Sequence, residues 1–62
     1  MSSRTYTVET HGQSATIWWG IRKVAVTPLA RLPEWYDALR TQCRSQGIWD
    51  VHFADTDGHV FA

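Results

Sequence analysis

The chain has 62 residues, six basic and six acidic side chains, and one cysteine. This length accommodates one domain, residues 1–62, which buries only about 60% of the surface that the unfolded chain exposes. Zero net charge argues against a general nucleic-acid binder, because non-specific affinity for phosphate needs a basic excess. One cysteine cannot form an internal disulfide, and the residues after Met1 contain no apolar run as long as a signal peptide, so we expect a cytoplasmic protein.

Residues 4–9 and 14–19 are predicted as strands, because apolar and polar side chains alternate in both. His11-Gly12 supplies the turn between them. Neighbouring residues of a strand point to opposite faces. Alternation therefore places Trp19 on the apolar face of the second strand and Trp18 on the opposite face.

A third strand is predicted over residues 21–27, which are rich in β-branched side chains. Gly20 precedes it either as a tight turn or as a bulge in a longer strand, and we favour the turn. The strand ends where Pro28 removes a donor from the ladder.

Residues 33–46 are predicted as a helix, because apolar side chains recur at helical spacing and polar side chains fill the other side. The apolar stripe consists of Leu32, Tyr36, Leu39 and Cys43. Gly47 is expected to take a left-handed conformation that ends the helix, with Ile48 folding back onto Cys43 in a Schellman ending. Trp35 flanks the stripe, and we favour a core position for it.

Two further strands are predicted after the helix, at residues 49–54 and 59–62. The segment Asp55-Thr56-Asp57-Gly58 between them is a strong turn signal. The resulting hairpin would bring Phe61 opposite Phe53.

These elements predict an α+β domain of order β-β-β-α-β-β, in which a small antiparallel sheet of four to five strands carries one helix on one face. The expected core on the helix-covered face contains Tyr6, Val8, Ile17, Trp19, Trp49, Val51, Phe53 and Phe61. The uncovered face keeps one large aromatic side chain, Trp18, among polar residues. In the same alternation, Ala54 lies on the uncovered face.

An exposed tryptophan in polar surroundings is typical of an interaction hot spot, so the uncovered face is the expected partner-binding surface. The candidate residues are Trp18, Thr16, Arg22, Lys23, Asp50 and His52. Trp18 is equally consistent with a supporting role, if the sheet curls or if loops cover both faces. A homodimer through this face is a further option.

The charges divide between the two halves of the chain. Residues 1–31 hold four cations and one carboxylate, a balance of +3, and residues 32–62 have the opposite balance of −3. Opposite charges could satisfy each other across strands, which we favour, or could form a dipole that steers a partner.

The histidines and aspartates near the carboxyl end permit a metal-site hypothesis, which we do not favour. His52 and His59 fall on opposite faces of the predicted hairpin, and the aspartates are explained by the turn. Cys43 lies on the apolar stripe near the carboxyl end of the helix, where the dipole opposes a thiolate. We therefore expect no catalytic residues, no metal, no cofactor and no enzymatic activity.

The residues from Phe53 to Phe61 resemble the strand-turn-strand ending of the glyoxalase and extradiol dioxygenase superfamily, with Thr56 in place of its usual proline. This resemblance implies a metal-dependent enzyme fragment that uses the C-terminal His/Asp hairpin. A shared solution to the same turn is the simpler interpretation.

In size, lack of motif and α+β make-up, the chain resembles the small standalone inhibitors of phages and mobile elements, including anti-CRISPR proteins. That resemblance implies a non-catalytic protein-protein interaction module, which inhibits a host or defence complex by occupying one of its surfaces. The alternative is a small single-strand nucleic-acid-binding protein that uses Trp18 with Arg4, Arg22, Lys23 and Arg31.

Overall fold

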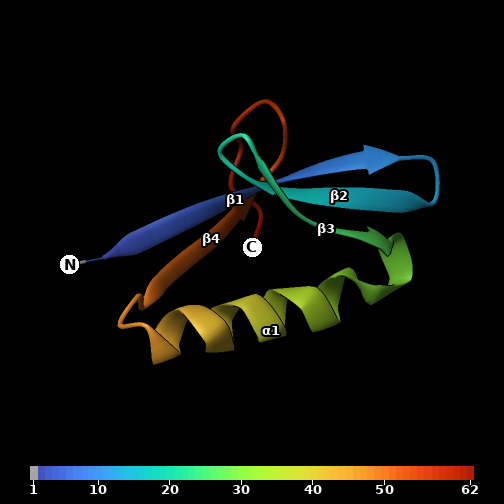
Figure 1. Ribbon diagram of the computed structural model, residues 1–62. Coiled ribbons are helices and arrows are strands. Elements are labelled where there is room, and N and C mark those ends of the chain that lie inside the picture. Colours follow the sequence, from blue (N-terminus) through green and yellow to red (C-terminus); the bar gives the residue numbers. More distant parts are fainter. Residues whose placement is uncertain (1) are drawn as a thin grey trace.

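Four strands, a short 3-10 turn and one helix make up the fold of the computed structural model, which describes residues 2–62 (Figure 1). In chain order they are β1 (Ser3–His11), β2 (Ser14–Trp19), β3 (Arg22–Pro28), η1 (Leu29–Arg31), α1 (Leu32–Ser45) and β4 (Asp50–Ala54). The helix lies on one face of the sheet, as expected, so the predicted α+β class is confirmed. Within the described range, no helix is long and apolar enough to cross a membrane.

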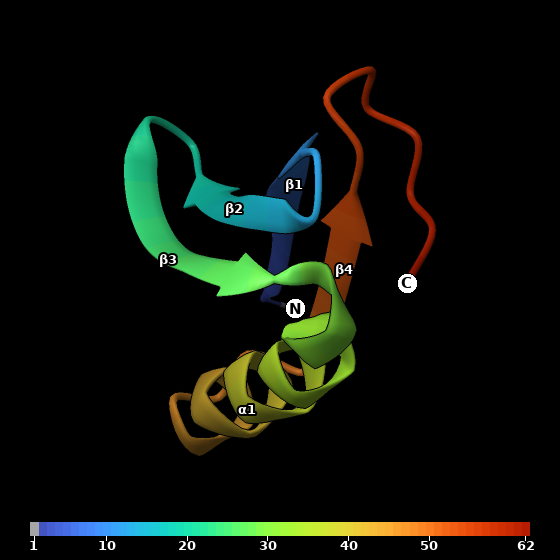
Figure 2. The ribbon, with the colours of Figure 1, turned by 90° about the vertical axis from the view of Figure 1, so that its right-hand side faces the viewer.

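The sheet is mixed, with the strand order β3-β2-β1-β4 (Figure 2). β2 pairs antiparallel with both β1 and β3, but β4 runs parallel to β1, with Phe53 opposite Tyr6. The expectation of a wholly antiparallel sheet is therefore wrong for this pair. α1 runs back along the sheet after β3, so β4 starts at the end of the molecule where β1 starts, and parallel neighbours need such a crossover.

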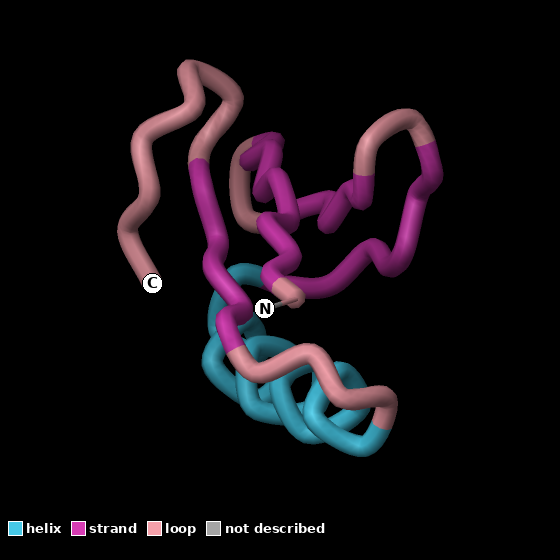
Figure 3. The backbone as a smooth tube through the Cα atoms, turned by 90° about the vertical axis from the view of Figure 1, so that its left-hand side faces the viewer, coloured by secondary structure: helices cyan, strands magenta, loops and turns pink. Residues whose placement is uncertain are grey.

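The C-terminal residues follow the outer edge of β4 without forming the expected strand over 59–62 (Figure 3). Ala54 and Val60 form an isolated bridge, and the Phe61 N–H donates to the Phe53 carbonyl at 2.9 Å. The Asp55 carboxylate accepts bonds from the backbone N–H groups of Asp57 and His59, each at 2.9 Å. The turn prediction is therefore correct, while the strand after the turn is reduced to one bridge.

The core lies between α1 and the inner face of the sheet. Ile17, Phe53 and Cys43 are fully buried, and the rings of Tyr6 and Tyr36 pack on Phe53 with centroid distances of 5.4 and 4.4 Å. Eight of the predicted strand and helix core residues are buried as expected: Tyr6, Val8, Ile17, Val51, Phe53, Leu32, Leu39 and Cys43.

Three aromatic residues that were assigned to the core are exposed instead. Trp19 is 43% exposed, Phe61 53% and Trp49 68%. Trp49 precedes β4, so strand alternation does not apply to it, and the Phe61 ring lies edge-on to the Tyr36 ring with a centroid distance of 6.0 Å. Ala54 is buried where the C-terminal tail pairs with it at Val60, whereas Asp50 and His52 are exposed.

Gly20 forms a turn, as favoured, and takes a φ of 63° between β2 and β3. The sheet also contains a bulge, but at another place: the register between β2 and β3 shifts between Ile17 and Trp18, which leaves Val24 as the extra residue. Bulges increase the local twist of a strand. This bulge therefore adds twist close to the turn that joins β2 to β3.

Candidate functional site: a cationic cleft

Three of the four cations of the N-terminal half form no salt bridge with a carboxylate of the described residues. Salt bridges within residues 2–62 join Arg31 to Glu34 at 3.5 Å, His11 to Glu9, and His59 to Asp55. Arg4, Arg22 and Lys23 take part in none of them. The favoured expectation that opposite charges pair across strands is therefore wrong for these three cations.

Strand directions place these three cations at one end of the molecule. β1 and β3 begin there, with Arg4 and Arg22 in their first two residues, and β2 ends there with Trp19. Glu9 lies near the other end of β1, and α1 begins at that opposite end with Glu34 in its first turn. These three cations therefore lie at one end of the molecule, which we call the cationic end; Asp50 also lies there, opposite Ser3, while Glu9 and Glu34 lie at the other end.

A cleft of about 390 Å³ opens at the cationic end, between the sheet and α1. Its lining residues are Arg4, Tyr6, Trp19, Arg22, Lys23, Val24, Leu39, Gln42 and Gln46, which we call the cationic cleft. The lining contains three cations, two side-chain amides and no carboxylate. Such a site attracts an anionic group and offers it several hydrogen-bond donors.

Arg4 holds the wall of the cationic cleft. Its guanidinium carbon lies 3.7 Å from the centroid of the Trp19 ring, a cation–π contact. Nη1 of Arg4 donates to the Tyr6 hydroxyl at 3.3 Å, and this hydroxyl also lies 3.2 Å from Sγ of the buried Cys43. These contacts join β1, β2 and α1, so the Trp19 ring has a defined position although it is exposed.

The same contacts shift the pKa values of the Arg4 guanidinium and the Tyr6 hydroxyl. Burial raises the pKa of the Tyr6 hydroxyl, and the hydrogen bond from Arg4 opposes this shift. The hydrogen bond to Tyr6 in turn raises the pKa of Arg4, which burial opposes. Arg4 therefore stays charged and Tyr6 stays neutral at physiological pH.

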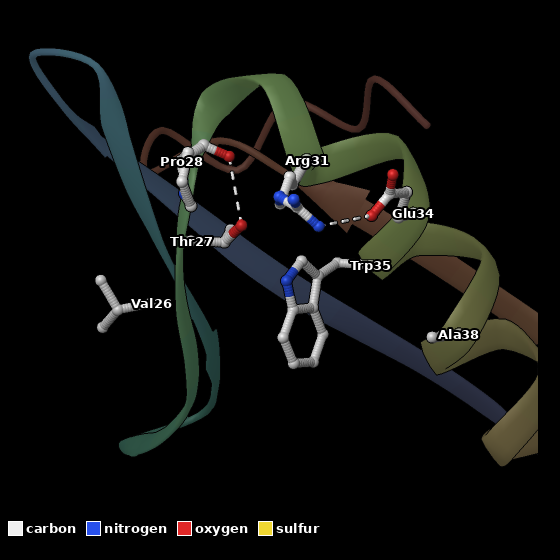
Figure 4. Close-up of a pocket in the computed structure, with 7 residues that line it drawn as sticks. All are labelled: Val26, Thr27, Pro28, Arg31, Glu34, Trp35 and Ala38. Carbon is white, nitrogen blue, oxygen red and sulfur yellow. Dashed lines mark hydrogen bonds and ion pairs between the residues drawn. The ribbon is translucent and has the colours of Figure 1, made fainter.

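A second cleft, of about 460 Å³, lies beside the first between the end of β3 and the beginning of α1 (Figure 4). Its lining residues are Val26, Thr27, Pro28, Arg31, Glu34, Trp35 and Ala38, which we call the edge cleft. The Trp35 ring stands between the strand and the helix (Figure 4). Trp35 is partly buried against the core, in agreement with the favoured prediction.

The predicted binding surface on the uncovered face is less available than expected. Thr16 is buried, at 7% exposure, and Trp18 is partly buried. Nε1 of Trp18 donates to Glu9 at 3.2 Å, and Nζ of Lys23 lies 6.0 Å from its ring centroid. Trp18 is therefore held in place on both sides by charged neighbours.

The other four candidate residues are exposed but lie in two groups. Arg22 and Lys23 line the cationic cleft, whereas Asp50 and His52 lie on β4, at the opposite edge of the sheet. β1 and β2 separate the two groups. The structure therefore brings together only the cationic half of the predicted set.

Of the cleft residues, Arg4 was named with Arg22 and Lys23 only in the nucleic-acid alternative, and Trp19, Gln42 and Gln46 were not predicted. One signal was available for Arg4, because it lies two residues before Tyr6 and so shares its face of β1. Trp19 shared the apolar alternation of the core, and that alternation outweighed the favoured turn at Gly20, which makes Trp19 the last residue of its strand. The two glutamines lie on the flank of a helix and carry no motif.

The metal-site hypothesis finds no geometric support in the described range. No group of three His, Cys, Asp or Glu residues is arranged there to hold a metal ion. Nδ1 of His59 lies 3.6 Å from Asp55, and the hydrogen bond from the His59 backbone lowers the pKa of that carboxyl.

Comparisons with known proteins add no relative from which a function could be transferred. The two clefts, their charges and the exposed side chains around them are therefore the basis for a function. The chain matches no protein-family model, no curated protein and no solved structure.

Proposed function

We propose that this chain is a non-catalytic protein-interaction module, which binds an acidic surface of a larger protein through the cationic cleft. The observation that supports this most directly is the gathering of Arg4, Arg22 and Lys23, free of salt bridges in the described structure, around the exposed Trp19. Arginine and tryptophan are the residue types most often found at the energetic centre of protein interfaces.

Exposed apolar side chains beside the cleft favour a protein partner over a small anion. Ile21, in the turn that joins β2 and β3, is fully exposed, and Trp19 two residues before it is 43% exposed. An aliphatic side chain in this position gains free energy when a partner removes it from water. A nucleic-acid backbone offers little apolar surface for such a contact.

An inhibitor of the kind that phages and mobile elements encode fits this proposal. Such a protein acts by occupying a surface and needs no pocket for turnover, only a rigid contact site. The cation–π and hydrogen-bond contacts that join Arg4 to Trp19 and Tyr6 supply that rigidity. The opposite charges at the two ends of the molecule would orient it as it approaches an acidic complex.

Affinity capture with a matched pair of variants tests the proposal. Arg22→Glu reverses a charge in the cleft lining, whereas Arg44→Glu makes the same change outside both clefts. Both residues are exposed, so both variants are expected to fold. We expect proteins captured by the wild-type chain to be retained by Arg44→Glu and lost with Arg22→Glu, as measured by mass spectrometry. Equal retention by both variants would contradict the proposal.

Single-stranded nucleic acid is a second candidate, favoured by the combination of three cations with the exposed Trp19 ring. Neutralisation of three phosphates would give a slope of about −2 for log affinity against log salt. A gel shift with a short single-stranded oligonucleotide at low salt separates the two candidates. A retarded band that disappears in Arg22→Glu would favour nucleic acid.

A further inference from the structure

The cationic cleft and the edge cleft lie along one seam between β3 and α1. On the helix they are bordered by residues spaced four, three, four and four apart, which form a single stripe on one side of α1 and its flanking turns. This stripe consists of Arg31, Trp35, Ala38, Gln42 and Gln46. On the other side both clefts are bordered by β3, from Arg22 to Pro28. Together they form the β3–α1 groove.

The chemistry of the β3–α1 groove changes along its length. Arg22 and Lys23, with Arg4 behind them, make the end near the start of β3 strongly cationic. Trp35 and Ala38 make the middle apolar (Figure 4). At the far end the charge of Arg31 is matched by its salt bridge to Glu34. A complementary occupant therefore carries carboxylates at one end and an apolar side chain in its middle.

The outer edge of β3 adds main-chain groups to this groove. The Leu29 N–H donates to the Gln13 carbonyl, so the Ser14–Pro28 pair between them is of the non-hydrogen-bonded type. Val26, two residues before Pro28, also belongs to a non-hydrogen-bonded pair, so its N–H and C=O point away from β2. Pro28 has no N–H and Val24 is the bulge residue, so this edge offers an extended chain a short pairing site at Val26.

We propose that the β3–α1 groove binds an extended acidic peptide segment of the partner protein. The segment is about as long as β3, which has seven residues. Its carboxylates lie against Arg22, Lys23 and Arg4, and an apolar side chain packs on Trp35. This inference rests on the proposed function and names the form in which the partner presents its acidic surface.

A labelled heptapeptide tests the inference by fluorescence anisotropy. The probe has three glutamates followed by alternating leucine and serine, and the comparison peptide has lysines in place of the glutamates. We expect the acidic peptide to bind and the lysine peptide not to bind. Arg22→Glu should weaken binding of the acidic peptide at least ~10-fold, while Arg44→Glu should change it less than ~2-fold.

A second matched pair tests the apolar middle of the groove. Ala38→Glu places a charge in the lining, and Thr41→Glu places the same charge on an exposed helix position outside both clefts. Circular dichroism checks that both variants fold. We expect only Ala38→Glu to weaken peptide binding. Equal effects of the two substitutions would show that total charge decides the affinity and would overturn the inference.

Two other outcomes overturn the inference in distinguishable ways. If the captured partner is lost with Arg22→Glu but no acidic peptide binds, the proposed function stands and the partner presents a folded surface. If a single-stranded oligonucleotide competes with the acidic peptide and binds more tightly than it, the groove recognises phosphate instead of a peptide.

Discussion

Arg4 connects three parts of the molecule through one side chain. It stacks on Trp19 of β2, donates to Tyr6 of β1, and lies 3.8 Å from Sγ of Cys43 on α1. A guanidinium suits this position because it combines a flat face for stacking with several donors at its edge. Because the Tyr6 hydroxyl holds the Arg4 guanidinium, and this guanidinium stacks on Trp19, the position of Trp19 and the shape of the cationic cleft depend on Tyr6.

The Tyr6 hydroxyl is expected to make stability sensitive to alkaline pH. Burial raises the pKa of Tyr6 in the folded state, so the unfolded chain loses this proton first. The contribution of Tyr6 is therefore complete below about pH 10 and is lost as the pH rises through the folded-state pKa. The pKa of Tyr36 is raised by burial as well, so some alkaline sensitivity remains without Tyr6.

Tyr6→Phe tests this arrangement in two ways. At neutral pH we expect it to lower the free energy of unfolding by about 1 kcal/mol, because Arg4 and Cys43 lose a partner. Above pH 10 the stability of the variant should fall less steeply than that of the wild type. Urea unfolding at several pH values measures both effects. Parallel curves of stability against pH for the two proteins would show that ionisation of the Tyr6 hydroxyl does not cause the loss of stability at alkaline pH.

At the scale of elements, the carboxyl end of α1 shows how far local sequence determines the fold. The N–H of Ile48 donates to the Cys43 carbonyl at 2.9 Å, and that of Gly47 donates to the Arg44 carbonyl at 3.0 Å. With Gly47 at a φ of 83°, these are the two bonds of a Schellman ending. The chain is thereby turned towards the start of β4.

Gly47→Val should lower the free energy of unfolding by about 1 kcal/mol or more, because a β-branched residue is strained at positive φ. Apart from Gly47 and its two chain neighbours, no atom of the described structure lies within 4 Å of the added Cβ position, so the cost comes from the backbone conformation. Gly47→Asn is the matched comparison, since asparagine tolerates this region, and it should cost less. Thermal unfolding measures both, and equal losses would point to another cause.

Four strands and the helix could be predicted from the sequence, whereas the strand expected over residues 59–62 is reduced to one bridge, and the other errors lie at the ends of elements. Tyr6, Val8 and Ile17 lie inside strands, where period-two alternation assigns a face, and their burial follows the prediction. Trp19 is the last residue of β2, and Trp49 lies just before β4. At such positions the strand does not continue on both sides, so alternation no longer fixes the face to which the side chain points.

Strand pairing needed information that the local pattern does not contain. The connection from β3 through α1 to β4 runs along the sheet and back, which fixes the direction of β4. Whether β4 then pairs with β1 or with β3 depends on where the helix packs. Alternation of apolar residues is the same in either case, so the parallel pairing with β1 could not be predicted from it.

At the scale of the whole molecule, the charge asymmetry of the sequence becomes an asymmetry in space. The two hairpins bring the starts of β1 and β3 to one end, and the helix begins at the other. Separation of charge on a small neutral protein produces a field that orients it near a charged partner. The candidate site could be predicted only in part, because Arg22 and Lys23 are local but their meeting with Arg4, Trp19 and α1 is a product of the fold.

The four tryptophans report on four different surfaces of the molecule. Trp19 lies in the cationic cleft, Trp35 in the edge cleft, Trp18 on the uncovered face and Trp49 beyond the end of α1. Incorporated fluorotryptophan gives one fluorine signal for each residue, and single Trp→Phe variants assign them. Each signal shifts or broadens when its own surface is covered.

The most direct measurement is therefore the fluorine spectrum of the labelled chain, free and bound to its captured partner. Binding along the β3–α1 groove predicts that the signals of Trp19 and Trp35 move most, that the Trp18 signal moves less, through Lys23 beside its ring, and that the Trp49 signal keeps its position. A shift of the Trp18 signal with unchanged Trp19 and Trp35 signals would place the partner on the uncovered face and contradict the account.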